Sequence, residues 1–398
     1  MANNNKNIVL NVPTLRFPEF GGEWKKCNLG DICSFFSGGT PSSSNKEYYD
    51  GVIPFIRSGE IHSKKTELFI SEEGYRNSTT KMVQTGDLLM AIYGATSGDI
   101  AIGKIDGAIN QAILCLRTVE NKMFIKSVWQ KHVNKILLTY LQGGQGNLSA
   151  EIVKKISINI PEYSKEQEKL ASLMSLIDER ISTQNKIIED MRKLKSAIIK
   201  RIFSVEYLCQ RRKILLSDIS LKITKKNTDN KITNVLSNSA NQGIVSQEII
   251  FDREIANKEN TSGYYIIKCG DFVYNPRKST AAPYGPINKY EGSIDGIISP
   301  LYVCFSTQNI NRNYLYWYFQ SKAWYKYIYK NGDTGTRHDR VSIKDDIFFA
   351  MPLYIHNPVE QQSISKNLSK IELKITIEEH QLELLFQQKT YLLQQMFI

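Results

Sequence analysis

The chain repeats itself once, and this duplication is the feature that most restricts its possible folds. The stretch TGDLLMAIYG (85–94) corresponds to CGDFVYNPRK (269–278), and IDGAINQAILCLRT (105–118) corresponds to IDGIISPLYVCFST (294–307). The Gly-Asp pairs are turn residues that lead into apolar runs, so we expect them to mark strand entries. Collinear matches of this kind predict two copies of one domain.

The end of each copy also matches, with GQGNLSAEIVKKISINIP (144–161) against GTRHDRVSIKDDIFFAMP (335–352). In this alignment the alternating apolar positions are Ile156, Ile158 and Ile160 in the first copy and Ile347, Phe349 and Met351 in the second. Alternation with a period of two predicts a half-buried strand. We therefore expect a strand at both places.

A long amphipathic helix follows each copy, and Glu166-Gln167 and Glu360-Gln361 open the two helices 194 residues apart. Three-four spacing predicts a narrow seam suited to a partner helix. The seam positions are Ile177, Ile181, Gln184, Ile188, Met191 and Ile198 in the first helix, and Ile371, Ile375, Glu378, Leu382, Leu385 and Leu392 in the second. Polar seam residues, including Lys195 and Lys389, are expected to set the register of the pair.

Chain connectivity predicts that the two helices are antiparallel, because the first leads away from the first domain and the second must return toward it. A helix of about 38 residues spans roughly 57 Å at 1.5 Å per residue. The alternative is that each helix packs only on its own domain. The predicted fold is α+β, with two pseudo-repeated mixed α/β domains separated by two long antiparallel helices in a coiled coil. The predicted segments are residues 1–165 and 206–358 for the domains, and 166–205 and 359–398 for the helices.

Composition limits the classes of function. The formal net charge of +11 and pI of about 9.1 suggest a polyanionic partner. The six cysteines form no CxxC pair and the five histidines are scattered, so we expect neither a metal site nor a disulfide framework. No long uncharged apolar run and no signal-peptide pattern occur, which predicts a cytoplasmic protein without a membrane partner.

Catalytic signatures are missing from the sequence. An adenine methyltransferase would carry Asn or Asp, two prolines and an aromatic ring, and the nearest string, NPRK (275–278), lacks the second proline and the ring. The glycines of SGGTPSSSNK (37–46) are not followed by Gly-Lys-Ser/Thr, so this is not an ATP-binding P-loop. We expect no catalytic residues and no cofactor in this chain.

Several stretches carry a resemblance to a known family: VPTLRFPEFGGEWKKCNLGDI (12–32), IPFIRSGEI (53–61), GDLLMAIYGATSG (86–98), INQAILCLRT (109–118) and IPEYSKEQEKLASLMSLID (160–178). Together with the domain–helix–domain–helix order, they resemble the specificity subunit of type I restriction–modification systems. The resemblance implies a non-catalytic subunit with two target recognition domains, each reading one half of an asymmetric bipartite site in double-stranded DNA.

The resemblance also implies partners. The long helices would bind two methyltransferase subunits, and restriction subunits would join that complex. S-adenosylmethionine and ATP would be used by the partner subunits, whose complex would be an adenine-N6 methyltransferase and an ATP-dependent endonuclease. Two alternatives stay open: a DNA-reading fragment of a single-chain restriction–methyltransferase, and a coiled-coil scaffold that reads no DNA. Met1 and the final helix lead us to expect a whole subunit.

Basic, amide and hydroxyl side chains in loops are the usual readers of phosphates and bases. On this ground the predicted DNA contacts of the first domain are Arg57, Lys64, Lys65, Arg76, Lys81, Thr96, Ser97, Gln145 and Asn147. Those of the second domain are Arg277, Lys278, Ser279, Lys289, Arg337, His338 and Arg340. For each residue, the alternative is a solvated surface group.

Overall fold

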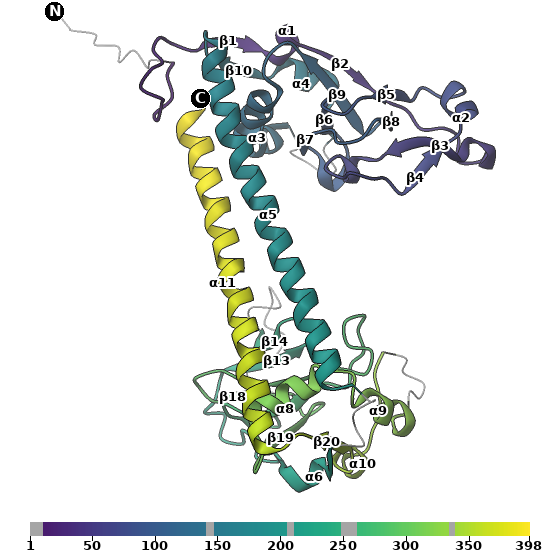
Figure 1. The fold of residues 1–398 in the computed structure, drawn as a ribbon, viewed down its shortest axis with the longest axis vertical. Helices are drawn as coiled ribbons and strands as arrows, with labels where there is room; N and C mark the ends of the chain where they lie inside the picture. The colour runs from purple at the N-terminus through teal and green to yellow at the C-terminus, as the bar shows by residue number, and fades with distance from the viewer. Residues whose placement is uncertain (1–10, 141–146, 205–210, 248–260, 334–338) are drawn as a thin grey trace, which may run out of the picture. The chain divides into compact units, whose positions relative to one another are not determined.

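The computed structural model describes residues 11–140, 147–204, 211–247, 261–333 and 339–398 (Figure 1). The contacts of the chain divide it into two compact units, one formed by residues 1–185 with 380–398 and the other by residues 186–379. Each unit therefore holds one mixed domain together with parts of both long helices. The boundaries between the four predicted segments remain predictions.

The first unit contains short strands and helices that lead into one long helix. In chain order these are β1 (Lys25–Asn28), α1 (Leu29–Ile32), β2 (Cys33–Ser37), η1 (Lys46–Tyr48), β3 (Tyr49–Ile56), η2 (Ser58–Glu60), β4 (Leu68–Ile70), α2 (Glu72–Arg76), β5 (Lys81–Val83), β6 (Leu88–Ala91), η3 (Gly94–Thr96), β7 (Ile100–Ile102), β8 (Gly107–Ile109), β9 (Ile113–Thr118), α3 (Lys122–Tyr140), α4 (Ala150–Lys155), β10 (Ser157–Ile160) and α5 (Ser164–Ile202). The helix α5 continues into the second unit.

The second unit follows a similar order. Its elements are β11 (Arg212–Leu215), α6 (Leu216–Ile219), β12 (Ser220–Lys222), β13 (Val235–Ser239), β14 (Gly243–Ser246), β15 (Tyr265–Ile267), β16 (Phe272–Tyr274), β17 (Ile287–Lys289), β18 (Gly296–Ile298), β19 (Val303–Thr307), α8 (Arg312–Phe319), α9 (Tyr325–Asn331), α10 (Asp345–Phe349), β20 (Pro352–Ile355) and α11 (Pro358–Met396). The helix α11 returns into the first unit.

The sheets of the two units have the same topology. In the first unit the strand orders are β1-β10, β2-β9-β6-β7 and β4-β3-β8-β5, and in the second they are β11-β20, β12-β19-β16-β17 and β14-β13-β18-β15. Within these sheets β3 pairs with β8 in parallel, and so does β13 with β18, while the neighbouring pairs are antiparallel. This agreement of order and direction confirms the predicted duplication.

Local hydrogen bonds repeat as well. The Oε1 atom of Gln167 accepts from the backbone of Asn121, and that of Gln361 accepts from the backbone of Asn311. The predicted Gly-Asp turns are also alike: Asp87 accepts from the Gln84 amide at 3.0 Å, and Asp271 accepts from the Lys268 amide at 2.7 Å. The glycines before these aspartates have φ of 90° and 91°, where an L side chain would be strained.

One part of the predicted repeat alignment is wrong. Ile158 and Ile160 lie in strand β10, but Ile347 and Phe349 lie in helix α10. The true equivalent of β10 is β20, which pairs with β11 as β10 pairs with β1. The error arose because the short helix α10 carries apolar residues two positions apart, and so few residues cannot separate a helical from a strand period.

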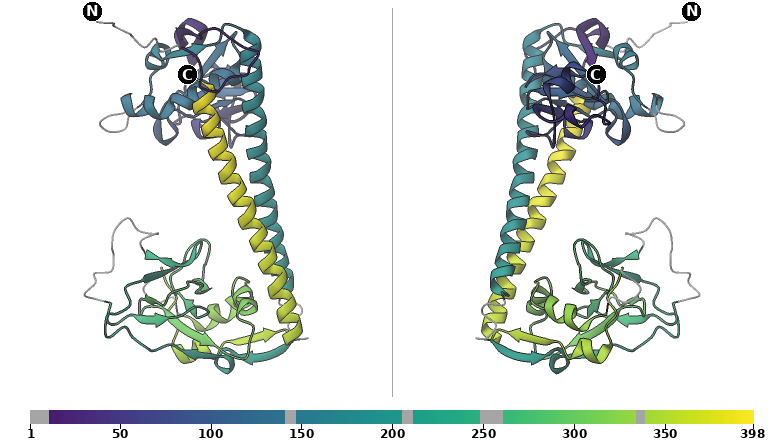
Figure 2. Two further views of the ribbon diagram at one scale, coloured as in Figure 1. Left: turned by 90° about the vertical axis from the view of Figure 1, so that its left-hand side faces the viewer. Right: turned by 90° about the vertical axis from the view of Figure 1, so that its right-hand side faces the viewer.

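The long helices are antiparallel within each unit. In the first unit, Lys389 of α11 lies 2.7 Å from Asp178 of α5. In the second unit, Arg192 pairs with Glu379 and Lys195 pairs with Glu372, so the partner number falls as the α5 number rises. Both views in Figure 2 show the two helices side by side. This pairing agrees with the direction that chain connectivity predicts.

The predicted seam positions are all buried or half-buried. Ile177, Ile181 and Leu385 belong to the core of the first unit, and Ile198 and Ile371 pack against that of the second. Within each unit, parts of both helices therefore contact the domain as well as each other, so features of both sequence-based alternatives are present.

In the first domain the core lies between the sheet containing β6 and helix α3. In the second domain it lies between the sheet containing β16 and helix α8. In the first unit, Leu114 and Leu116 of β9 pack with Phe124 of α3. In the second unit, Phe305 takes the strand position of Leu116, and Phe272 stacks on Phe305 with ring centroids 5.4 Å apart. The two copies thus keep one scaffold with different core residues.

Candidate nucleic-acid interface

Two predicted DNA-contact segments of the second unit lie together, although they are far apart in sequence. Arg277 and Arg340 form an isolated antiparallel bridge through their backbones. The backbone amide of Lys278 also donates to the Asp339 carbonyl at 2.8 Å. The loop after β16 and the segment before α10 therefore share one edge that carries Arg277, Lys278 and Arg340.

The first unit repeats this arrangement. The Leu148 amide donates to the Ile92 carbonyl at 2.9 Å, which joins the loop after β6 to the segment before α4. Thr96 and Ser97 lie in that loop, and the exposed Asn147 directly precedes Leu148. The structure thus joins the same two kinds of loop in both units. The joined loops carry hydroxyl and amide groups in the first unit and basic groups in the second.

The guanidinium of Arg340 retains hydrogen-bonding capacity. Its Nε atom is buried and has no hydrogen-bond partner among the described residues, and a carboxylate oxygen of Asp339 lies 3.7 Å away. An unsatisfied buried donor is costly and calls for a partner. The Arg340 side chain as a whole is 34% exposed, and its backbone pairs with that of the exposed Arg277, so both guanidinium groups are candidates for contact with an anion.

The segment that connects β3 to β4, residues 57–67, is held by an acidic network. Arg57 contacts Glu60 at 3.1 Å and Glu67 at 2.7 Å. Burial alone would raise the pKa of Glu60, but hydrogen bonds from Arg57 and from backbone amides outweigh burial and lower the pKa to about 2. Because two carboxylates engage its charge, Arg57 is better suited to holding residues 57–67 in place than to the DNA contact predicted for it.

The same segment carries the exposed Lys64 and Lys65. The Nε2 atom of His62 lies 2.9 Å from the carboxylate of Asp99, just after the loop that holds Thr96 and Ser97. This contact ties the segment with its two lysines to the candidate interface of the first unit.

Other predicted contacts are placed less favourably or lie outside the described residues. Arg76 and Lys81 are exposed, and Lys81 is on β5, at the opposite edge of its sheet from β4. Lys289 is 10% exposed, contacts Glu291 at 2.8 Å and donates to Asn313, so its charge is already engaged. Three predicted contacts lie outside the described residues: Gln145, Arg337 and His338. The exposed Ser279 follows Lys278 in the basic loop.

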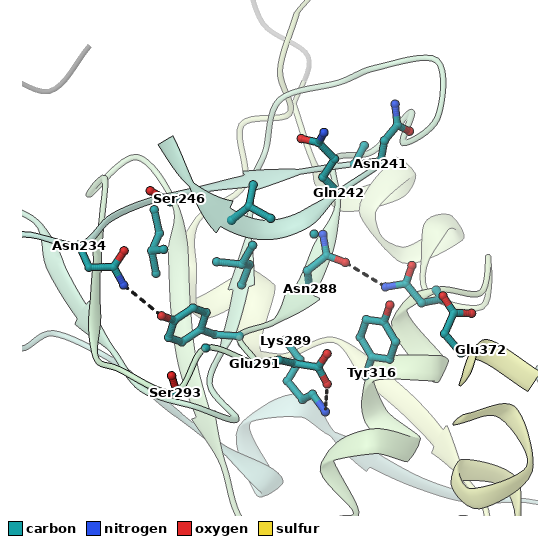
Figure 3. Close-up of a pocket in the computed structure, with 18 of the residues that line it drawn as sticks. Asn234, Asn241, Gln242, Ser246, Asn288, Lys289, Glu291, Ser293, Tyr316 and Glu372 are labelled. Atoms are coloured by element: carbon teal, nitrogen blue, oxygen red, sulfur yellow. Dashed lines mark hydrogen bonds and ion pairs between the residues drawn. The ribbon is translucent and has the colours of Figure 1, made fainter. Parts of the chain in front are cut away.

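A polar pocket of about 640 Å³ lies in the second unit (Figure 3). The turn between β13 and β14 contributes Asn241 and Gln242 to its lining, and Asn288, Tyr316 and Gln320 contribute further polar groups. Sequence reasoning did not select these amides. The signal that could have identified them is the amide-rich stretch NVLSNSANQG (234–243), whose Asn, Ser and Gly residues favour a turn.

Two further observations bear on the class of protein. No helix within the described part of the chain is long and apolar enough to cross a membrane. Across the same ranges, no three His, Cys, Asp or Glu side chains gather as a metal site would require.

Comparison with known proteins identifies a matching domain. Residues 21–192 match the family model of the type I restriction modification DNA specificity domain. The specificity subunit of type I restriction enzyme MjaVIII from Methanocaldococcus jannaschii is 25% identical over 197 residues, which are 48% of this chain and 43% of that subunit. The EcoR124I/EcoR124II specificity subunit from Escherichia coli is 26% identical over 175 residues, or 41% of this chain and 43% of that subunit. Each match thus spans less than half of the relative.

Solved structures extend the likeness to the fold of nearly the whole chain. The type I restriction-modification S subunit from M. genitalium has a TM-score of 0.57 at 14% identity, covering 97% of this chain and 99% of that one. A chain from a study of type I complex assembly and conformational transition has a TM-score of 0.55 at 14% identity, covering 93% of this chain and 96% of that one.

Proposed function

We propose that this chain is a type I restriction–modification specificity subunit and reads the two halves of an asymmetric bipartite DNA site, one half with each unit. As a specificity subunit it is non-catalytic. The observation that carries the proposal is the repeated pairing of two loops, at Ile92 and Leu148 in the first unit and at Arg277 and Arg340 in the second. One scaffold with different loop side chains is what reading two different half-sequences requires.

The charge of the chain supports the same proposal. A net charge of +11 favours a polyanion, and Arg277, Lys278 and Arg340 gather on one edge of the second unit. Contacts from basic groups to phosphates position a protein on the duplex, while amide and hydroxyl groups read the base edges. The paired loops supply both kinds of group.

The outer faces of the long helices support docking of the methyltransferase subunits. Ile377, Leu384 and Tyr391 recur every seven residues along α11, and their exposed fractions are 49%, 49% and 57%. On α5, Leu176 and Leu194 are 60% and 56% exposed. The seam positions are buried or half-buried, so these more exposed apolar side chains are the ones available to contact another helix. We propose that two methyltransferase subunits bind here, and that restriction subunits join through them.

The long helices are also proposed to fix the distance between the half-sites. Each has 39 residues, or roughly 58 Å at 1.5 Å per residue. The complex would act on double-stranded DNA in the cytoplasm, with S-adenosylmethionine and ATP bound by the partner subunits.

A domain exchange tests the proposal. Residues 1–165 would be replaced by the equivalent segment of a specificity subunit with a different target, and methylated adenines would be mapped in cells that also carry the methyltransferase partner. We expect one half of the methylated site to change and the other to stay the same. A change in both halves would refute independent reading, and methylation without a bipartite sequence would refute the function.

A scaffold without DNA reading predicts a different result for the purified complex. A complex built on such a scaffold would show no salt-dependent binding to duplex DNA. A complex that reads DNA would bind the duplex and lose affinity steeply as salt is raised.

A further inference from the structure

The connection between the two strands β13 and β14 differs clearly from its counterpart in the first unit. In the first unit the matching strands β3 and β4 are joined by residues 57–67, which hold the Arg57 network. In the second unit they are joined by residues 240–242 alone. A difference this large on a shared scaffold is expected where the two units recognise different sequences.

The short connection presents two neighbouring amides to solvent. Asn241 and Gln242 are both exposed, and the Ser239 hydroxyl oxygen accepts from their backbone amides at 3.3 and 3.4 Å. Gly243 ends the turn with φ of 73°. Figure 3 shows the two side chains beyond Asn288, and all three residues line the same pocket.

A buried amide network supports this turn from below. Asn238 is 2% exposed and Asn288 is 6% exposed, and the Asn288 amide nitrogen donates to the Asn238 side-chain oxygen at 2.7 Å. It also donates to the Ser239 carbonyl, and Gln320 donates to the Asn288 oxygen at 3.1 Å. Buried polar networks that are satisfied in this way hold one geometry, because each alternative leaves a group unpaired. The backbone leading into the turn is therefore fixed.

The turn is also tied to the basic loop of the candidate interface. The Asn275 side chain donates to the Asn238 carbonyl at 2.8 Å, two residues before Arg277. In the first unit, a different contact, between His62 and Asp99, links the β3–β4 connection to the loop after β6. In both units the connection thus lies next to the residues proposed to contact DNA.

We propose that the Asn241–Gln242 turn is a base-reading element of the second unit, and that its amides recognise adenine in the major groove. An Asn or Gln side chain accepts from the N6 amino group of adenine and donates to N7, a pattern that no other base offers. The fixed backbone lowers the cost of orienting these side chains. This inference rests on the proposed DNA-reading function and adds the base class for part of the second half-site.

The test uses the full chain with its methyltransferase partner and a pool of DNA duplexes randomised within the second half-sequence. Alanine variants N241A and Q242A would be compared, singly and together, with Q308A, which removes an exposed amide elsewhere in the second unit. We expect discrimination at one or two A·T positions of the second half-sequence to fall by about 5-fold to about 140-fold for each bidentate contact between an amide and adenine that is lost. The first half-sequence and the Q308A profile should not change.

Carboxylate variants separate reading from a structural role. N241D and Q242E keep the shape of the side chain but remove its donor. Preference should then move from adenine toward cytosine, whose N4 amino group donates to a carboxylate. A turn that only supports the fold would not change the preferred base.

The outcomes distinguish the inference from the function on which it rests. If the double alanine variant keeps the wild-type preference at every position of the second half-sequence, the turn does not read bases and the proposed function still stands. If the wild-type complex itself shows no bipartite preference, the proposed function fails. Equal thermal unfolding of the variants and wild type is expected, since both side chains are exposed.

Discussion

The Nζ atom of Lys389 lies 2.7 Å from the Oδ1 atom of Asp178, and this contact joins α11 to α5 in the first unit. The second unit contains the same contact with the helices exchanged, because Lys195 pairs with Glu372 and each residue lies 194 positions from its equivalent. Lys126 of α3 adds a second cation to Asp178 at 2.6 Å. Burial alone would raise the pKa of Asp178, but its two lysine hydrogen bonds outweigh burial and hold the pKa below its ordinary value.

Charge reversal should show that Lys195 and Glu372 stabilise the helix pair. Lys195→Glu would place two carboxylates together and lower the stability of the second unit by about 1 kcal/mol, a modest figure because Glu372 is 45% exposed and partly screened. The double variant K195E/E372K should recover most of this loss in calorimetric unfolding. Lys193→Glu is the control, since its partner Glu189 lies on the same helix. A double variant no more stable than K195E would contradict the pairing.

Matched insertions should lengthen the distance between half-sites. Four helix-forming residues after Asn185 in α5 and four after Glu379 in α11 add roughly 6 Å at 1.5 Å per residue. This corresponds to about two base pairs of duplex. We expect the same two half-sequences with a longer unspecified spacer, methylated less efficiently because the second half-site is rotated around the duplex.

Inserting the four residues into α5 alone is the control for this experiment. It shifts Lys195 away from Glu372 and should abolish methylation rather than change the spacer. An active matched variant with its spacer unchanged would mean that the helices do not set the distance.

Removal of Arg277 should weaken binding to all duplexes. If Arg277 contacts a phosphate, Arg277→Ala reduces the salt dependence of binding by about one unit of slope. The matched control is Lys289→Ala, whose charge is engaged by Glu291 and Asn313 and should leave the slope unchanged. Fluorescence anisotropy at several salt concentrations measures both. Equal slopes for wild type and R277A would place Arg277 away from the phosphates.

The Arg57 network should make the stability of the first unit depend on pH in the acidic range. The folded pKa of Glu60 is about 2. Its unfolded value is about 4.3, so its contribution is complete above about pH 5 and is lost as pH falls toward about 2. Glu60→Gln should therefore lower stability near neutral pH and flatten its decline between about pH 5 and pH 3. Thermal unfolding across this range measures both effects, and an unchanged pH profile would contradict them.

Polar substitution on the outer face of α11 should block the methyltransferase partner. Leu384→Asp changes a side chain that is 49% exposed, so the isolated chain should keep its unfolding temperature. Co-purification of the methyltransferase subunit should fall strongly, because the charge would be buried at the interface. Glu383→Gln, an exposed neighbour, serves as the control. If L384D assembles normally with the methyltransferase subunit, the docking surface lies elsewhere.

Much of the fold could be predicted from local patterns. The long helices follow from three-four spacing over many turns, and the Gly-Asp turns at Asp87 and Asp271 follow from turn chemistry. The duplication was visible because both copies keep these patterns in order. Where the pattern was short, at Ile347 and Phe349, the prediction failed, because few residues leave helix and strand periods ambiguous.

The candidate interface was only partly predictable. Residue type selected Arg277 and Arg340 separately, but no local rule indicates that their backbones pair. Residue type also selected Arg57 and Lys289, whose contacts with carboxylates engage their charges. Whether a basic side chain is available for a phosphate depends on its neighbours in space, which a single sequence does not reveal.

Two copies of one domain and two matching helices can be predicted from the amino-acid sequence, since these properties depend on periodicity and order along the chain. Which loops meet, which charges are engaged and which amides are buried became clear from the folded structure. The Asn238–Asn288 contact spans 50 residues and exists because strands β13 and β17 approach each other in the folded unit. Such contacts depend on packing between segments that are distant in sequence. They determine how the strands, turns and helices that local patterns predict are brought together into a site.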